Sequence, residues 1–187
     1  LLSVFLVFVV LYVAWGVVTP YLLPSRAANW MDSLYAVKET AAARHPSPRL
    51  IYVAGSSGLF SVSAQQLERR VGVPTINYGT SVGVGMKYLL HRTRKLLKPG
   101  DTAVLAFEYE LFDPVQRLNR FQARFIMSKD NSFFRMMPMK DMPFLFAGLD
   151  FQSFIWAFAE HVGLWTYSQS CYGLSEFLNS HGDEMCA

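Results

Sequence analysis

The chain has 187 residues, which is enough for one ordinary α/β domain with an additional segment and too few for two comfortable domains. Charged residues make up only 17% of the chain, and the formal net charge is +3. The basic residues are scattered rather than gathered in one run. This distribution is typical of solvated helix faces and argues against a nucleic-acid footprint, so no nucleic-acid partner is expected.

The first segment is strongly apolar. Residues 1–18 read LLSVFLVFVVLYVAWGVV and contain no charged side chain. A run of about 17 to 25 apolar residues can cross a bilayer, so residues 1–20 are predicted to form a transmembrane anchor that ends at Thr19 and Pro20. The alternative is a cleaved signal peptide, for which Ala27 and Ala28 are the candidate cleavage site. The anchor makes the chain a single-pass protein of the cell membrane, with its folded domain in the periplasm or outside the cell.

Residues 21–48 are predicted to connect the anchor to the folded domain, which we expect to span residues 49–187. The connector contains a helix over residues 30–44, because Trp30, Leu34, Val37 and Ala41 recur at helical spacing. The chain starts without a methionine or a basic leader, so further residues are expected before it.

Strands and helices alternate after the connector. Residues 49–54, 73–77 and 102–107 are short apolar runs of the kind that form buried parallel strands. Helices are predicted between them, over residues 63–71 and 84–97. This order predicts an α/β fold with a three-layer parallel sheet, similar to flavodoxin-like proteins.

The last third of the chain has a different character. Residues 121–139 are rich in Phe and Met, and residues 141–162 are predicted to form a helix broken near Gly148. Such aromatic density indicates either a core or a surface that faces a membrane or a partner. The final 20 residues read as a loop. Cys171 and Cys186 form either a disulfide or a free pair, and their spacing does not fit a zinc site.

The candidate site lies where the predicted strands end, since ligands bind at the carboxyl ends of parallel strands. The first strand is followed by residues 55–58, Gly-Ser-Ser-Gly, the second by residues 77–81, and the third by Glu108. A serine in a tight turn between strand and helix can act as a nucleophile, with backbone N–H groups stabilising an oxyanion. The same turn could instead hold an anion or serve only as a turn.

Residues 53–58, Val-Ala-Gly-Ser-Ser-Gly, resemble the first motif of the SGNH (GDSL-like) hydrolases, and residues 77–79, Asn-Tyr-Gly, resemble the second. The segment over residues 107–113 is similar to the membrane-anchored branch, which includes proteins of lipoteichoic acid D-alanylation and of exopolysaccharide acylation. The resemblance covers about residues 50–114. It implies that Ser57 is the nucleophile and that the N–H groups of Ser57 and Gly79 bind the oxyanion.

The chain departs from this family in two places. Glu108 stands where the third motif normally supplies an asparagine, and no Asp-x-x-His motif occurs for the catalytic base. His181 is the remaining candidate for the base, with an ordinary loop histidine as the alternative. Either the histidine motif lies beyond this chain or the protein has lost catalysis, and the sequence favours the first.

The resemblance implies acyl transfer or acyl-ester hydrolysis on a cell-envelope glycan by a serine nucleophile. The expected partners are the lipid bilayer, the glycan and a membrane-bound acyl-transfer or polysaccharide-export protein. No cofactor and no metal ion is expected. The alternative is a non-catalytic, membrane-anchored subunit of a polysaccharide synthesis or export complex, and a third interpretation is an anion-binding sensor domain.

Overall fold

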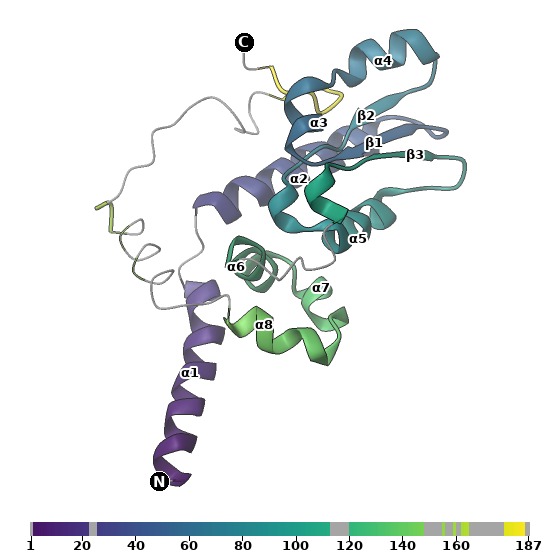
Figure 1. The fold of residues 1–187 in the computed structure, drawn as a ribbon. Coiled ribbons are helices and arrows are strands. Elements are labelled where there is room, and N and C mark those ends of the chain that lie inside the picture. The colour runs from purple at the N-terminus through teal and green to yellow at the C-terminus, as the bar shows by residue number, and fades with distance from the viewer. Residues whose placement is uncertain are drawn as a thin grey trace. The chain divides into compact units, whose positions relative to one another are not determined.

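The computed structural model describes residues 2–22, 26–112, 120–147, 155, 159, 162–164 and 178–185. The chain divides into two compact units (Figure 1). The first, here called the helical unit, comprises Leu1–Asn29 and Arg117–Ser168. The second, the α/β unit, comprises Trp30–Gln116 and Gln169–Ala187, and it carries all three candidate site residues.

The α/β unit is built on a parallel sheet of three strands in the order β2-β1-β3. The strands are β1 (Leu50–Ala54), β2 (Thr75–Asn77) and β3 (Thr102–Ala106). The start of β1 pairs with the start of both neighbours. The predicted α/β class with a parallel sheet is therefore confirmed. The chain passes from β1 to β2 on one side and then to β3 on the other, so the connections diverge next to β1.

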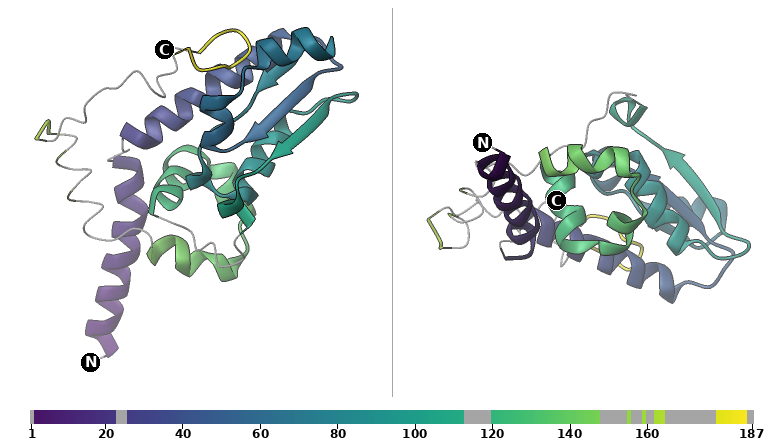
Figure 2. Two further views of the ribbon diagram at one scale, coloured as in Figure 1. Left: turned by 45° about the horizontal axis from the view of Figure 1, so that its top comes forward. Right: turned by 90° about the horizontal axis from the view of Figure 1, so that it is seen from below.

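Helices cover both faces of this sheet (Figures 1 and 2), namely α2 (Arg26–Arg44), α3 (Ser56–Ser61), α4 (Ala64–Val71) and α5 (Met86–Leu96). One face carries α3 and α4, with Gly58 of α3 close to Tyr52 and Ala54 of β1. The other face carries α2 and α5, and α2 buries Met31, Leu34 and Tyr35. Short 3-10 turns follow β2 and β3: η1 (Val82–Val84) and η2 (Tyr109–Phe112).

The helix α4 begins and ends at the residues that the sequence predicts. Ser63 is its N-cap and accepts a hydrogen bond of 3.2 Å from the backbone N–H of Gln66. Gly72 ends the helix with φ 69°, a left-handed conformation that glycine adopts at little cost. Asp183 also lies at the start of α4, where it accepts hydrogen bonds from the N–H groups of Ala64 and Gln65.

A buried ion pair joins the start of β1 to the residue before β3. Nη2 of Arg49 lies 2.5 Å from Oδ2 of Asp101, and the two side chains are 1% and 0% exposed. Arg49 also donates a hydrogen bond to the carbonyl group of Ala42, near the end of α2, and another to that of Leu96, the last residue of α5. One guanidinium group thus ties two helices and two strands together.

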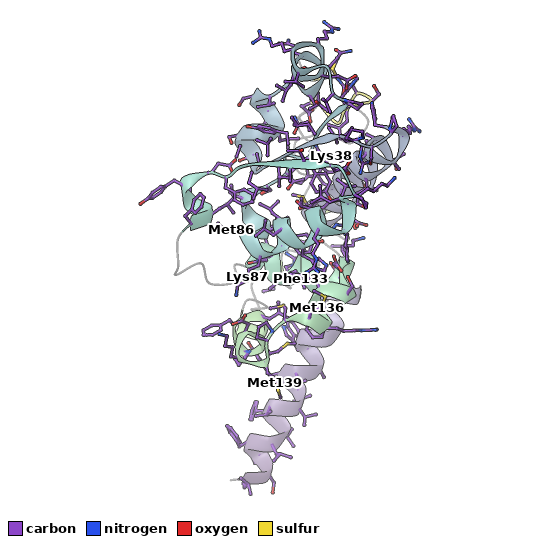
Figure 3. All side chains as sticks on the ribbon, turned by 90° about the vertical axis from the view of Figure 1, so that its right-hand side faces the viewer. Lys38, Met86, Lys87, Phe133, Met136 and Met139 are labelled. Carbon is purple, nitrogen blue, oxygen red and sulfur yellow. The ribbon has the colours of Figure 1, made fainter. Side chains whose placement is uncertain are left out.

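The segment over residues 178–185 lies along the outer edge of β2. The N–H of Asn77 donates a 2.8 Å hydrogen bond to the carbonyl of His181, and Leu178 forms an antiparallel bridge with Glu184. Nζ of Lys38, labelled in Figure 3, donates to the carbonyl groups of Asn77 and Gly182 at 2.8 and 2.6 Å. The segment was predicted as loop, and these contacts fix it.

The helical unit begins with α1 (Leu2–Leu22). The predicted helix end at Thr19 and Pro20 is wrong, because a proline in the last turn removes only one backbone donor and the helix continues. Within the described part of the chain, none of the helices combines the length and the apolar character that crossing a bilayer requires. The predicted transmembrane anchor over residues 1–20 is therefore not confirmed.

The rest of the helical unit contains α6 (Arg120–Lys129), α7 (Asn131–Met136), η3 (Met139–Asp141) and α8 (Met142–Ala147). A small core joins α6 to α8 through Ala123, Met127 and Leu145. Met136 and Met139, labelled in Figure 3, are instead exposed by 65% and 90%. The Phe- and Met-rich stretch thus supplies both core and surface. Most of the helix predicted over residues 141–162, and both Cys171 and Cys186, lie outside the described residues.

Candidate functional site

The candidate site begins at the turn that follows the central strand β1. Gly55 is the N-cap of α3, so Ser56 and Ser57 occupy the first turn of this helix. Ser57 is exposed, and Gly58 and Leu59 after it are buried. The sheet order places this turn where the connections diverge, which is the common place for ligands in open parallel sheets.

Glu108, two residues beyond the end of β3, binds directly to this turn. Its Oε1 accepts hydrogen bonds from the Ser57 hydroxyl at 2.6 Å and from the Ser57 N–H at 2.9 Å. Its Oε2 accepts a third, from the N–H of Gly55 at 2.9 Å. The carboxylate therefore occupies the position where backbone N–H groups converge.

The ionised form of Glu108 is favoured by these contacts. Burial alone would raise the pKa of this carboxyl group, but the hydrogen bonds from Ser57 and Gly55 bring the pKa below its ordinary value of 4.5. At neutral pH the group is a carboxylate that can accept a proton from Ser57, although its lowered pKa makes it a weak base.

Gly55 makes the close approach of Glu108 sterically feasible. A Cβ atom at this position would lie 2.5 Å from Oε2 and 2.6 Å from Oε1 of Glu108, and it would also collide with Val82. A residue with a Cβ atom here would displace the Glu108 carboxylate, so the hydrogen bonds between Glu108 and the turn depend on a glycine at this position.

Gly79, the predicted second oxyanion donor, lies beside α3 with its N–H already engaged. It donates a 2.9 Å hydrogen bond to Oδ1 of Asn77, whose Nδ2 donates to the carbonyl groups of Gly58 and Val62. A Cβ atom on Gly79 would lie 2.6 Å from the backbone nitrogen of Leu59. The structure thus gives Gly79 a packing role, and its N–H could reach an oxyanion only if the Asn77 amide turned away.

His181, the predicted general base, lies at the edge of β2 and is not brought to Ser57. Its Nε2 is 3.2 Å from Oε2 of Glu68, and its Nδ1 is 3.2 Å from the Ser180 hydroxyl. The hydrogen-bond partner of the Ser57 hydroxyl is Glu108 instead. The three predicted residues therefore do not converge, and Glu108 stands where a base for Ser57 would be needed.

The sequence predicted that Glu108 lies at the candidate site, as the residue that follows the third strand, but it did not assign Glu108 a role. Its position directly after the third predicted strand was the available signal, since β3 pairs with β1 and both strands end at the same edge of the sheet. The contact between His181 and Glu68 had no comparable signal. It depends on how the segment over residues 178–185 packs against β2.

The chain matches no protein-family model, and it has no significant match among curated proteins or among solved structures. The resemblance of its short motifs to the SGNH hydrolases therefore rests on those motifs alone.

Proposed function

We propose that this chain performs acyl transfer or acyl-ester hydrolysis on a cell-envelope glycan, with Ser57 as the nucleophile. The observation that carries the proposal is the exposed Ser57 hydroxyl, which donates a 2.6 Å hydrogen bond to the carboxylate of Glu108 at the carboxyl ends of β1 and β3. A nucleophile and a base within hydrogen-bond distance are the minimum set for this chemistry. An SGNH-like assignment of the fold belongs to the same proposal.

In the proposed reaction, Oγ of Ser57 attacks the acyl carbonyl carbon while its proton passes to Oε1 of Glu108. The tetrahedral intermediate collapses when its bond to the donor oxygen breaks, and Glu108 returns the proton to that oxygen. An acyl-serine remains. A glycan hydroxyl or a water molecule then attacks the acyl carbonyl carbon and gives its proton to Glu108. When the bond between the acyl carbon and Oγ of Ser57 breaks, Glu108 returns this proton to Oγ, which restores the Ser57 hydroxyl and the Glu108 carboxylate.

The same proton transfer would free an oxyanion donor. In the resting state the Ser57 N–H donates to Oε1 of Glu108. A neutral carboxylic acid is a weaker acceptor than a carboxylate, so protonation of Glu108 would loosen this hydrogen bond. The Ser57 N–H could then turn to the developing oxyanion, and Gly79 would contribute only after the Asn77 amide moves.

The proposed location is the cell membrane, with the α/β unit in the periplasm or outside the cell. Its support is the first half of α1, where the side chains from Leu2 to Val13 are almost all apolar and exposed. A helix that is apolar all round requires contact with lipid or with another protein. The bilayer and a membrane-bound acyl-transfer or export protein are accordingly the proposed partners.

A second candidate function is that of a non-catalytic subunit in a polysaccharide synthesis or export complex. It is favoured by one specific observation, namely that both predicted oxyanion donors are already paired within the chain, Ser57 with Glu108 and Gly79 with Asn77. In this alternative the Ser57–Glu108 contact only fixes the turn after β1.

Glycan acylation in cells separates the two candidates. Cells carrying Ser57→Ala should lose the acyl groups of their envelope glycan, whereas cells carrying Ser56→Ala should retain them, with both variants present at normal levels. Unchanged acylation in the Ser57→Ala cells, together with loss of the glycan itself on deletion of the gene, would favour the subunit.

A further inference from the structure

Three side chains with metal-binding atoms meet at the edge of β2, away from the Ser57 turn. His45 follows the last residue of α2, Glu68 belongs to α4, and His181 lies in the segment over residues 178–185. One ligand atom from each of the three lies within 4.8 Å of the others. We propose that His45, Glu68 and His181 bind a divalent transition-metal ion, with Zn²⁺ as the best match.

His45 has the orientation of a metal-binding histidine. Its Nδ1 lies 2.8 Å from the carbonyl oxygen of Ala41. A carbonyl oxygen can only accept, so Nδ1 carries the proton and Nε2 keeps the lone pair that a metal needs. Metal-binding histidines commonly donate their second nitrogen to a carbonyl group in this way, which fixes both the tautomer and the direction of the ring.

His181 and Glu68 already face each other. Nε2 of His181 lies 3.2 Å from Oε2 of Glu68, and the ring of His181 stands 5.2 Å from that of His45, measured between centroids. The N–H of Thr75 donates a 2.9 Å hydrogen bond to Oε2 of Glu68 and orients the carboxylate. A metal ion would take the place of the hydrogen bond between His181 and Glu68. With Nε2 bound to the metal, the neutral ring carries its proton on Nδ1, which lies 3.2 Å from the Ser180 hydroxyl and can donate to it.

The size and exposure of the cluster suit one ion. Metal bonds of ~2.0–2.2 Å require ligand atoms somewhat closer than 4.8 Å, so the three side chains would draw together when the ion binds. The side chains of His181 and Glu68 are 13% and 33% exposed, so both are largely buried and still reached by solvent. Solvent could therefore supply water as a fourth ligand.

The mixed ligand set decides which metal is proposed. Two imidazole groups and one carboxylate are a common protein ligand set for zinc with one open position. Mg²⁺ and Ca²⁺ prefer oxygen ligands and have little affinity for imidazole. The proposed site should therefore bind Zn²⁺ in preference to Mg²⁺ and Ca²⁺.

The proposed ion would fasten the C-terminal segment to two helices. His181 is already held through its carbonyl by Asn77, and Gly182 next to it by Lys38. A metal bond to the ring would add a link to His45 after α2 and to Glu68 in α4. This role is structural, and it is independent of the chemistry proposed for Ser57.

The test is metal binding by the full chain. The purified protein, carrying Cys171→Ser and Cys186→Ser so that thiols do not contribute, is stripped with a chelator and then titrated with Zn²⁺ in competition with a chromophoric chelator. We expect one Zn²⁺ per chain, no competition by Mg²⁺, and visible absorption of a four-coordinate complex when Co²⁺ is used. His45→Ala, Glu68→Gln and His181→Ala should each weaken binding at least about tenfold.

His91→Gln is the control, since it removes an imidazole from α5, outside the cluster. Glu68→Gln preserves the shape of the side chain and the acceptor for Thr75, so it reports on the metal without disturbing the fold. Absence of saturable Zn²⁺ binding would overturn the proposal. So would binding that the three cluster variants leave unchanged or that His91→Gln weakens equally, and the His181–Glu68 contact would then be an ordinary hydrogen-bonded pair.

Discussion

The Ser57 hydroxyl donates a 2.6 Å hydrogen bond to Oε1 of Glu108, which joins the turn after β1 to the residues that follow β3. The same carboxylate accepts the N–H groups of Ser57 and Gly55. Three donors from one turn therefore converge on one negative charge. The proposed chemistry depends on whether this charge serves as a base for Ser57 or only fixes the turn.

Replacing Glu108 by glutamine tests its role as the base. Glu108→Gln should lower the turnover of an aryl acetate at least about 100-fold, because general-base catalysis typically contributes 10²–10⁴-fold. The amide is nearly isosteric, and its oxygen can still accept from Ser57, although its NH2 group cannot accept from the Gly55 N–H. Circular dichroism should confirm that the variant keeps its fold. A variant with full turnover would assign Glu108 a purely structural role. Glu110→Gln, which alters an exposed carboxylate nearby, is the matched control.

The pH dependence of turnover should identify the base. Glu108 must be ionised to accept the proton, and its pKa is below the ordinary value of 4.5 because of the hydrogen bonds from Ser57 and Gly55, which outweigh its burial. The rate should therefore be flat around neutral pH and fall only in acid, at a pH below 4.5. A rate that instead falls near pH 6.5, the ordinary pKa of histidine, would point to an imidazole base.

The architecture of the α/β unit was predictable because its signals are local. The three strands are short apolar runs, and α4 begins and ends at the serine and the glycine that the sequence marks, Ser63 and Gly72. The helix α3 was not predicted, because the six residues Ser-Ser-Gly-Leu-Phe-Ser show no apolar periodicity. Its Gly58 fits under Tyr52 and Ala54, a tertiary contact that no local pattern records.

The sequence could place the candidate site at the carboxyl ends of the strands, but it could not predict how the side chains there are oriented. Parallel strands end at one edge, so the proximity of Ser57 and Glu108 follows once β3 is known to pair with β1. The hydrogen bond between Gly79 and Asn77, by contrast, depends on the orientation of one side-chain amide. The position of His181 depends on a loop of distant sequence that returns to β2.

Lys38 should make stability rise with pH. Burial lowers its pKa from 10.5 to about 7, against the opposing charges of Asp183 and Glu184. Between pH 7 and 10.5 the unfolded chain keeps the Lys38 proton that the folded chain has released, so a higher pH favours folding. Urea unfolding at pH 7, 8 and 9 should show a free energy of unfolding that increases by up to about 1.4 kcal/mol per pH unit.

Lys38→Met supplies the comparison for this pH dependence. The variant has no ionisable group at this position, so the increase between pH 7 and 9 should disappear, even if its stability at pH 7 differs from that of the original chain. An equal slope in both proteins would show that another group is responsible.

The buried pair of Arg49 and Asp101 should contribute strongly to stability. The hydrogen bonds from Arg49 hold the pKa of Asp101 well below its ordinary value, so the stabilisation is present above about pH 4 and is lost as the pH falls further. Asp101→Asn leaves the Arg49 charge buried without its partner and should lower the free energy of unfolding by about 3 kcal/mol at pH 7. Urea unfolding measures this loss of free energy. In the control variant Glu110→Gln, the free energy of unfolding should change by less than about 0.5 kcal/mol. A loss as small in Asp101→Asn would contradict the account of this pair.

The nucleophile itself is identified most directly by covalent labelling. The full-length protein is treated with a fluorophosphonate probe, and the modified peptide is mapped by mass spectrometry. We expect the adduct on Ser57, its complete loss in Ser57→Ala, and its retention in Ser56→Ala, with circular dichroism showing that both variants are folded. No adduct on the folded protein, or an adduct that persists in Ser57→Ala, would contradict the assignment of Ser57 as the nucleophile.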